Sequence, residues 1–171
     1  LDRESMVKKI REALAGDYGK VPVYLLHGDL TQEEMNGLYE HKKIKAMLNF
    51  TKGEGFGRPL LEFSLTGKPI LVSNWSGHLD FLSPENTVLI PGQVKQVHPS
   101  AHVPNMILNE AGWFSPDPVA SSRALIDVFE NYNKYQEKGK KQGYKIKKEF
   151  NYDNMVLVLK SYFDKYVPAP L

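Results

Sequence analysis

Residues 53–82 read GEGFGRPLLEFSLTGKPILVSNWSGHLDFL, and this stretch decides the fold. Glycine occupies every second position from 53 to 57, which is typical of a loop that needs unusual backbone angles or close approach of a ligand. Glu54 lies inside this loop, and Glu62 follows eight positions later. The stretch therefore combines a glycine loop, one carboxylate within it and another just beyond.

The segments around this loop alternate between strand and helix patterns. Pro59 suits the first turn of a helix that runs to about Thr66, and Gly67 suits the C-terminal cap of that helix. Short, nearly continuous apolar runs are typical of strands covered on both faces of a parallel sheet. These runs predict strands at residues 21–26, 44–50, 68–73 and 87–90.

Further helices are expected on both sides of this region. The first runs from Asp2 to Gly16, and the second begins at a capping box formed by Thr31 and Glu34. Residues 92–116 read as a long irregular connection. Asp117 and Pro118 begin another helix, and a final helix covers residues 152–166. The faces expected to pack inward are Met6, Ile10 and Leu14; Met35 and Leu38; Leu125, Ile126, Phe129 and Tyr132; and Met155, Val156, Leu159, Tyr162 and Phe163.

This alternation predicts the α/β class: an open parallel sheet with helices on both faces, followed by C-terminal helices. The 171 residues suit a single domain spanning residues 1–171. Cysteine is absent, which excludes disulfides and cysteine-based metal sites or nucleophiles. No run approaches the ~18 apolar residues of a membrane span, so we expect a cytoplasmic protein with at most peripheral membrane contact. Because the chain begins at Leu1 and goes straight into a helical pattern, we expect a fragment of a longer protein.

The net charge of +2 is too small to indicate nucleic-acid binding, and the aromatic residues of a stacking platform for single strands are not interleaved with the basic ones. The basic residues are nevertheless clustered between positions 138 and 148. The cluster predicts a solvated helix face, with contact to an anionic membrane surface or a polyanion as the alternative. It consists of Lys138, Lys140, Lys141, Lys145, Lys147 and Lys148.

The predicted sheet places the glycine loop where ligands bind. In an open α/β sheet this is beyond the carboxyl ends of the strands, which here are the loops after Leu26, Phe50 and Ser73. Free N–H groups of the first helical turn, around Leu60 to Glu62, favour an anion such as a diphosphate. The residues alone therefore predict a nucleotide with its diphosphate at the helix start and its ribose on one glutamate. The other glutamate would touch whatever lies beyond the diphosphate.

Other interpretations of the same residues stay open at this point. A glycine loop alone is common, Glu62 alone is most often a solvated helix residue, and glycosidases also use two carboxylates. The dinucleotide fingerprint G-x-G-x-x-G is not met, because the spacing here is G-x-G-x-G. Three weaker patterns are a triad of Ser76, His78 and Asp80, a metal pair of His98 and His102, and packing roles for Trp75 and Trp113, with Trp75 packing against the donor site.

The stretch EGFGRPLLE resembles the donor-site motif of the retaining group-one glycosyltransferases, in which two glutamates have this spacing. The continuation GKPILVSNWSGHLDFL and the upstream VYLLHGDLTQEEMNGLYEH are similar to the family's neighbouring segments, so the resemblance covers roughly residues 21–91. It implies the GT-B fold, in which two Rossmann-like domains face each other across a cleft. This chain would be the C-terminal, donor-binding domain, without the N-terminal acceptor domain.

The resemblance also implies roles for individual residues. Glu54 would be the catalytic residue that meets the donor sugar's hydroxyls, and Glu62 would hold the ribose. No cofactor or metal is implied, because a nucleotide diphosphate sugar is the substrate. The sugar and diphosphate would lie against Gly55, Phe56, Gly57, Arg58, Pro59, Leu60 and Leu61, with the base or rim formed by His27, Gly28, Asp29, Leu30, Ser76 and Gly77.

The sequence departs from the family in one respect: no clear match exists for the basic pair that grips the diphosphate. Lys52 and Arg58 are candidates without an assigned match. The expected reaction is transfer of a sugar to an acceptor hydroxyl with retention, the acceptor being a glycan, lipid or protein bound by the missing domain. We expect residues 1–171 alone to bind nucleotide weakly and not to catalyse transfer. The alternatives are a non-catalytic nucleotide-binding module and another α/β nucleotide-sugar enzyme, such as an epimerase, or a dehydrogenase.

Overall fold

The computed structural model describes residues 2–14, 16, 20, 22–103, 106–108 and 110–167. The chain separates into two compact units, Leu1–Leu38 and Tyr39–Leu171. The single domain predicted from the sequence stays a prediction. The two units are described separately below, and the candidate site lies in the second.

The first unit contains helix α1 (Arg3–Leu14), in which no residue is buried. The strand predicted at residues 21–26 is wrong for its described part, residues 22–26, which has no strand structure; Val21 lies outside the described residues. Val23, Tyr24 and Leu26 are 52%, 90% and 63% exposed. The physical reason is that an apolar run becomes a strand only where a neighbouring strand supplies hydrogen-bond partners, and none of the described residues does so for this segment.

Helix α2 (Gln32–Glu40) begins at the predicted capping box, which the structure confirms. The Thr31 amide donates to Glu34 Oε2 at 2.8 Å, and the Glu34 amide donates to Thr31 Oγ1 at 3.2 Å. At its other end, Lys68 Nζ donates to the carbonyls of Tyr39 and His41, 2.5 and 3.0 Å away. A cation at the carbonyl end of a helix complements the helix dipole, so Lys68 stabilises this end.

The second unit is built on a small parallel sheet. Its strands are β1 (Met47–Asn49), β2 (Ile70–Ser73) and β3 (Val88–Ile90), in the order β1-β2-β3, with Leu48 beside Leu71 and Val72 beside Leu89. Three of the predicted strands are therefore confirmed, and the mixed α/β class with them. Among the described residues no further strand joins this sheet.

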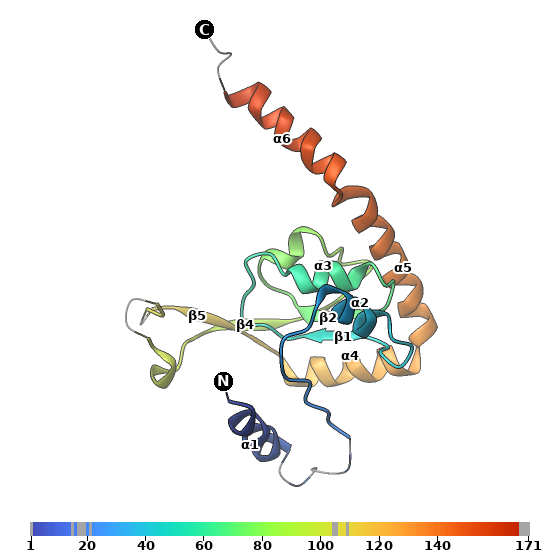
Figure 1. Cartoon of the computed structure of the whole chain (residues 1–171). Coiled ribbons are helices and arrows are strands. Elements are labelled where there is room, and N and C mark those ends of the chain that lie inside the picture. The colour runs from blue at the N-terminus through green and yellow to red at the C-terminus, as the bar shows by residue number, and fades with distance from the viewer. Residues whose placement is uncertain are drawn as a thin grey trace. The chain divides into compact units, whose positions relative to one another are not determined.

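Helices lie on opposite sides of the sheet, as Figure 1 shows. Helix α3 (Arg58–Ser64) packs against β1, and helix α4 (Pro118–Glu130) packs against β3. The core between these layers is made of fully or almost fully buried side chains. It includes Leu60, Phe63, Leu71, Val72, Phe81, Leu82 and Ile90.

Helix α4 begins as predicted but turns a different face inward. Asp117 caps its start, accepting from the Ala120 amide at 2.7 Å. The expected packing face is wrong, however, because Ile126 and Phe129 are 56% and 84% exposed, and Leu125 is exposed as well. The buried residues are Ser121 and Val128. Apolar residues occur on more than one side of this helix, and the side that packs is the one with Ser121 and Val128.

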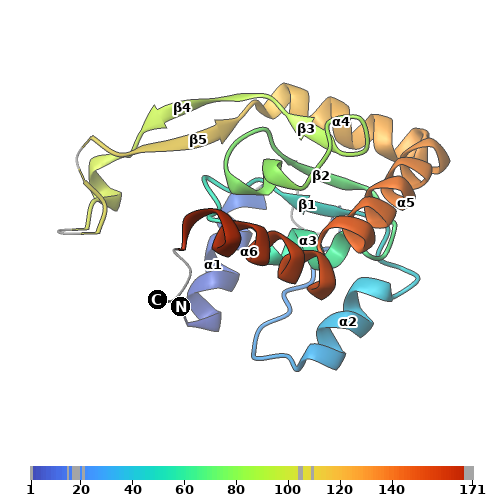
Figure 2. The ribbon, with the colours of Figure 1, turned by 90° about the horizontal axis from the view of Figure 1, so that it is seen from above.

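Residues 92–116 are not irregular, which corrects the sequence prediction. Strands β4 (Gly92–Gln96) and β5 (Gly112–Pro116) pair antiparallel as a ribbon, with the short helix η3 (Pro99–Ala101) in the connection. The ribbon extends away from the sheet in both Figure 1 and Figure 2. Strand β4 reads GQVKQ and lacks the continuous apolar run that marked the core strands, and all of its residues are exposed.

Helix α5 (Tyr132–Glu149) contains the lysine cluster and packs against α3 through glycines. A Cβ added at Gly139 would lie 2.6 Å from the Gly67 carbonyl oxygen, and one added at Gly143 would lie 2.6 Å from the Ser64 carbonyl oxygen. The backbone of α5 therefore touches the backbone at the end of α3. Gln142 of α5 is also buried, and its side chain donates to the Phe81 carbonyl and accepts from the Ser83 amide.

Helix α6 (Tyr152–Tyr166) forms where predicted, but none of its residues is buried. The expected packing face is therefore wrong, because Met155, Val156, Leu159, Tyr162 and Phe163 are all exposed by more than 40%. Apolar residues surround the middle of this helix, and the described residues cover too little of it to bury any. Within the described residues, no helix has the length and apolar character needed to span a membrane.

Replacing Gly143 by Ala should destabilise the second unit by about 1–2 kcal/mol, because the new methyl group would overlap the Ser64 carbonyl. Gly37→Ala is the matched control, since Gly37 is also helical but has nothing within 4 Å of an added Cβ. That substitution should be neutral or stabilising, because alanine favours helices over glycine by roughly 0.5–1 kcal/mol. Urea denaturation of the two variants gives the comparison, and equal stability of both would contradict the close backbone packing.

Candidate functional site

Two loops at the carboxyl edge of the sheet are bound to each other. The glycine loop (residues 51–57) follows β1, and the serine loop (residues 74–77) follows β2. The Glu54 amide donates to Ser76 Oγ at 2.8 Å, and Ser76 Oγ donates to the Glu54 carbonyl at 2.5 Å. The Gly77 amide also donates to the Glu54 carbonyl, at 3.1 Å. The sequence placed both loops on one rim, and these bonds bring them together.

Gly77 must be glycine for this contact. A Cβ at this position would lie 2.0 Å from the Gly55 carbonyl oxygen and 3.0 Å from the Glu54 carbonyl oxygen. Real Cβ atoms do not approach backbone oxygens so closely, so any side chain here would separate the loops. The small residue therefore serves loop-to-loop contact in this structure.

Ser76 has a backbone conformation that side chains rarely adopt, with φ 87° and ψ −170°. This region is essentially restricted to glycine and costs on the order of 1–3 kcal/mol. Among the described residues, no other non-glycine residue has a positive φ. The hydrogen bonds of its hydroxyl group to the amide and the carbonyl of Glu54 hold Ser76 in this conformation.

The glycine loop presents polar groups without partners. Among the described residues, no acceptor takes the amide hydrogens of Gly55, Phe56 or Gly57, and no donor reaches the Glu54 carboxylate. Gly57 has a φ of 88° and a buried backbone. An added Cβ at Gly57 would lie 3.1 Å from that of His78. Consecutive unpartnered amides beside a left-handed residue are typical of anion-binding loops.

The first turn of α3 does not offer the amides that the sequence analysis expected. The Leu60 and Leu61 amides both donate to the Gly57 carbonyl, at 2.9 and 3.2 Å. They are therefore engaged within the helix, and free donors around Leu60 to Glu62 are not observed for these two residues. Pro59 lies in the first turn as predicted and has no amide hydrogen. Donors for an anion come instead from the preceding loop.

Glu62 forms an ion pair with Arg58 on the exposed side of α3. Arg58 Nε lies 2.6 Å from Glu62 Oε1, and the side chains are 73% and 24% exposed. The hydrogen bond from Arg58 to Glu62, with the attraction between their charges, raises the pKa of Arg58 above its usual value. Burial, followed by the negative charge of Glu62, raises the pKa of Tyr39. Glu62 is thus a half-buried carboxylate with one oxygen engaged by a cation, not a fully solvated residue.

Lys52 and two tryptophans connect the glycine loop to the ribbon. Lys52 Nζ lies 3.9 Å from the centroid of the Trp113 ring, in a cation–π contact. The Phe114 amide donates to the Lys52 carbonyl at 3.1 Å. Trp75 stacks on Phe114, with centroids 5.9 Å apart and an interplanar angle of 1°. The sequence analysis treated both tryptophans as packing residues, Trp75 against the donor site, and did not connect Trp113 with it.

The Ser76, His78 and Asp80 pattern does not form a triad. His78 is 0% exposed, and its Nε2 lies 2.7 Å from the Ser73 carbonyl. A carbonyl oxygen only accepts, so Nε2 carries the hydrogen and Nδ1 is left as an acceptor, for which the described residues supply no donor. Ser76 Oγ is engaged by Glu54, and Asp80 is exposed. His78 is therefore a buried residue bonded to the end of β2, and it is not exposed to a ligand.

His98 and His102 do not lie on one helix face as metal ligands would. They flank η3, and each has a local partner: His98 Nδ1 lies 2.7 Å from Ser100 Oγ, and His102 Nε2 lies 3.2 Å from the Val97 carbonyl. Within the described ranges, no group of three or more His, Cys, Asp or Glu side chains could hold a metal ion.

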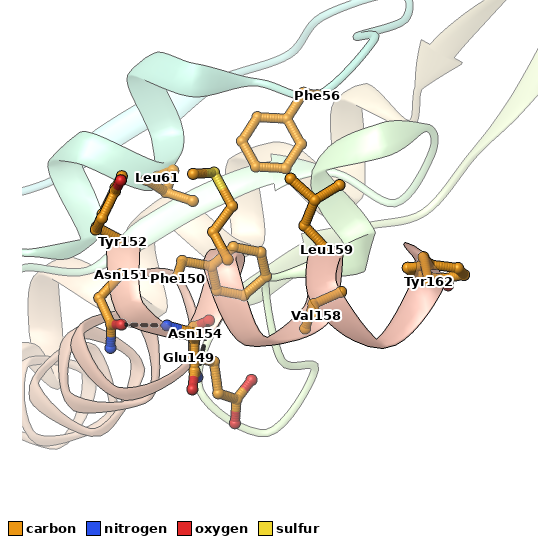
Figure 3. Close-up of a pocket in the computed structure, with 11 residues that line it drawn as sticks. Phe56, Leu61, Glu149, Phe150, Asn151, Tyr152, Asn154, Val158, Leu159 and Tyr162 are labelled. Carbon is orange, nitrogen blue, oxygen red and sulfur yellow. Dashed lines mark hydrogen bonds between the residues drawn. The ribbon is translucent and has the colours of Figure 1, made fainter. Parts of the chain in front are cut away.

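An apolar groove lies beside the glycine loop, and the sequence did not predict it. Its volume is about 590 Å³. Figure 3 shows Phe56 of the glycine loop facing Leu159 of α6, with Phe150 below them. The Phe56 ring also packs on Phe81, with centroids 5.0 Å apart. An aromatic residue between two glycines was the available signal. The other lining residues are Leu61, Glu149, Asn151, Tyr152, Asn154, Met155, Val158 and Tyr162.

The remaining predicted residues are not brought to this site by an observed contact. His27, Gly28, Asp29 and Leu30 precede α2 in the first unit, so their proximity to a base stays a prediction. The lysine cluster lies along α5. Lys145 donates to Ser83 Oγ at 2.9 Å, and Lys140 pairs with Glu137 at 2.6 Å, so these two are engaged within the domain.

Neither the models of known protein families nor the curated protein sequences match this chain. The interpretation of the site therefore rests on its geometry and on the sequence pattern. That geometry is a carboxylate, a row of amides and an exposed indole on two interlocked loops, with an ion-paired second carboxylate on the following helix.

Replacing Ser76 should reverse the usual order of alanine and glycine. Ser76→Ala removes both hydrogen bonds to Glu54 and keeps the unfavourable φ, so we expect a loss of about 1–2 kcal/mol. Ser76→Gly loses the same bonds but relieves roughly 1–3 kcal/mol of backbone strain, and should be the more stable variant. Thermal and urea denaturation of both proteins measure the order. An alanine variant more stable than the glycine variant would show that Ser76 is not strained.

Proposed function

We propose that this chain carries the donor-binding site of a retaining glycosyltransferase and holds a nucleotide diphosphate sugar on the two interlocked loops. The observation that carries the proposal is the pair of hydrogen bonds between Ser76 Oγ and the backbone of Glu54. It fixes the backbone of Glu54, whose carboxylate is unpartnered, next to the unpartnered amides of Gly55, Phe56 and Gly57 at the carboxyl edge of a parallel sheet. A diphosphate needs hydrogen-bond donors, and a sugar needs acceptors for its hydroxyls, so this loop suits a ligand that joins the two.

In this proposal the two glutamates have separate partners. The amides of the glycine loop hold the diphosphate, and Glu54 accepts hydroxyl groups of the sugar. Glu62 holds the ribose through Oε2, because Oε1 is already bonded to Arg58. The Arg58 charge lies close enough to offset part of the negative charge that the carboxylate adds near the diphosphate.

The reaction proposed for this site is a substitution at the sugar's anomeric carbon. The bond from that carbon to the diphosphate oxygen breaks, a bond to the acceptor's hydroxyl oxygen forms on the same face, and the hydroxyl proton leaves with the diphosphate. Stabilising the leaving diphosphate is the main catalytic requirement, and preorganised amides meet it without reorganisation. The acceptor, a glycan, lipid or protein, would be bound outside the described loops, and the lysine cluster would allow peripheral contact with an anionic membrane.

A binding panel tests this function directly. We expect at least one nucleotide diphosphate among UDP, GDP and ADP, and its nucleotide sugar, to raise the melting temperature of the protein by mass action. Stabilisation by bare nucleotides without any effect of the sugar would favour a nucleotide-binding module that is not a transferase. No stabilisation by any of these ligands at millimolar concentration would contradict the proposal.

Glu62→Ala should weaken binding of the bare nucleotide diphosphate by about 1–3 kcal/mol, the range for losing hydrogen bonds to a charged group. Calorimetric titration measures the change. Glu137→Ala is the matched control, because Glu137 also pairs with a cation on an exposed helix face but lies on α5. Arg58→Gln separates the two roles of Glu62, since it removes the ion pair and keeps the carboxylate. Unchanged affinity in Glu62→Ala would remove this residue from the site.

Glu54→Gln should spare the bare diphosphate and weaken the nucleotide sugar. The amide keeps the size of the side chain but replaces one acceptor oxygen by a donor, so hydroxyl groups of the sugar lose a charged acceptor, worth about 1–3 kcal/mol. Titrating the variant with the diphosphate and the nucleotide sugar in parallel gives both affinities. Equal losses for the two ligands would show that Glu54 does not distinguish sugar from nucleotide.

A further inference from the structure

Trp75 is a large, exposed aromatic residue in one of the two loops of the candidate site. It lies in the serine loop, directly before Ser76, and is 44% exposed. The core residues around the same loop, such as Phe81 and His78, are completely buried. A tryptophan that served packing alone would be expected to bury more of its surface, because burial of its rings is the source of its stabilising energy.

The indole is held in place by the ribbon. Its ring is parallel to that of Phe114, which is 5% exposed and bonded through its amide to the Lys52 carbonyl. The neighbouring ribbon residue, Trp113, is covered by the Lys52 ammonium group. The ribbon therefore supports Trp75 from one side and is itself fastened to the glycine loop. The exposed part of the indole is a preorganised surface, because little side-chain freedom is left to lose on binding.

The same loop carries the indole and anchors the backbone of Glu54. Ser76, next to Trp75, binds both backbone groups of Glu54, and Gly77 binds the Glu54 carbonyl. The contact between the loops is so close that no side chain fits at Gly77. The backbone segments that carry the indole and the carboxylate are thus held next to each other.

This pair of groups matches the two kinds of surface on a sugar ring. A pyranose presents hydroxyl groups around its edge and C–H groups on its faces, and these C–H groups carry partial positive charge that the negative face of an aromatic ring attracts. A carboxylate accepts from the hydroxyls, and the indole covers a C–H face. A nucleobase would also stack on an indole, but in the proposed function the hydroxyls of its ribose are held by Glu62, which leaves Glu54 for the sugar.

We propose that Trp75 stacks on the face of the sugar whose hydroxyl groups Glu54 accepts, so that the ribbon and the serine loop together form the sugar subsite. This inference rests on the proposed function and adds a specificity-determining residue to it. Because the indole needs C–H groups on one face of the ring, the subsite selects hexoses that have no axial hydroxyl on that face.

The test uses the two tryptophans of the chain, Trp75 and Trp113. Trp113→Phe keeps an aromatic ring under Lys52 and leaves Trp75 as the remaining tryptophan. This variant is titrated with UDP-glucose, GDP-mannose and ADP-glucose and with the corresponding bare diphosphates. We expect the nucleotide sugar that binds to change the Trp75 emission, and its bare diphosphate to change it much less.

Affinities complete the test. Trp75→Leu should weaken binding of that nucleotide sugar about 10-fold and that of the bare diphosphate less than 2-fold, whereas Trp75→Tyr should restore most of the lost affinity. Trp113→Leu is the matched control and should affect both ligands equally. The Trp113→Phe titration does not depend on the folding of the Trp75 variants.

Three results would overturn the inference. Equal losses for nucleotide sugar and diphosphate in Trp75→Leu would show that the indole stacks on the base. Unchanged affinity for both, with no change in Trp75 emission, would leave Trp75 a packing residue. If the wild-type protein bound neither ligand, the proposed function itself would be wrong and the sugar subsite with it.

Discussion

The contact between the backbones of Glu54 and Ser76 is the constraint on which the rest of the site depends. These residues are 22 positions apart, and the serine hydroxyl group binds both the amide and the carbonyl of Glu54. The strained backbone of Ser76 and the absence of space at Gly77 follow from the same contact. A strained residue persists only where its surroundings hold it. Here the strain is offset by bonds that fix the backbone of a residue with an unpartnered carboxylate.

Helix α5 braces this arrangement from outside the sheet. Its glycines let its backbone touch the end of α3, and Gln142 binds the segment just after η2 (Gly77–Asp80) through the Phe81 carbonyl and the Ser83 amide. Both ends of the loop pair are therefore supported, since α3 follows the glycine loop and η2 follows the serine loop. Both the carbonyl oxygen and the nitrogen of this buried side-chain amide are bonded. The bonds fix the position of α5, because a shifted helix would leave buried polar atoms unpaired.

The sequence predicted the parts of this structure that local patterns determine. Continuous apolar runs located β1, β2 and β3, and the Thr31–Glu34 pair located the start of α2. The patterns were insufficient where tertiary partners decide. Residues 22–26 are apolar but find no strand partner among the described residues, whereas Gly92–Gln96 is exposed and pairs with β5. Leu125 and Phe129 of α4 are exposed while Ser121 and Val128 are buried, and periodicity alone does not reveal which of these sides packs.

The basic side chains near the candidate site already have partners within the protein. Lys52 is the cation that could most directly meet a diphosphate, yet its ammonium group lies over Trp113, and Arg58 is bonded to Glu62. A cation that already has a partner adds less to anion binding, because part of its interaction energy is already used. Amides pay no such cost, since their dipoles are fixed by the backbone and have no competing acceptor among the described residues. An anion at this loop would therefore be recognised chiefly by backbone geometry. The site then depends more on the Glu54–Ser76 contact than on any single basic side chain.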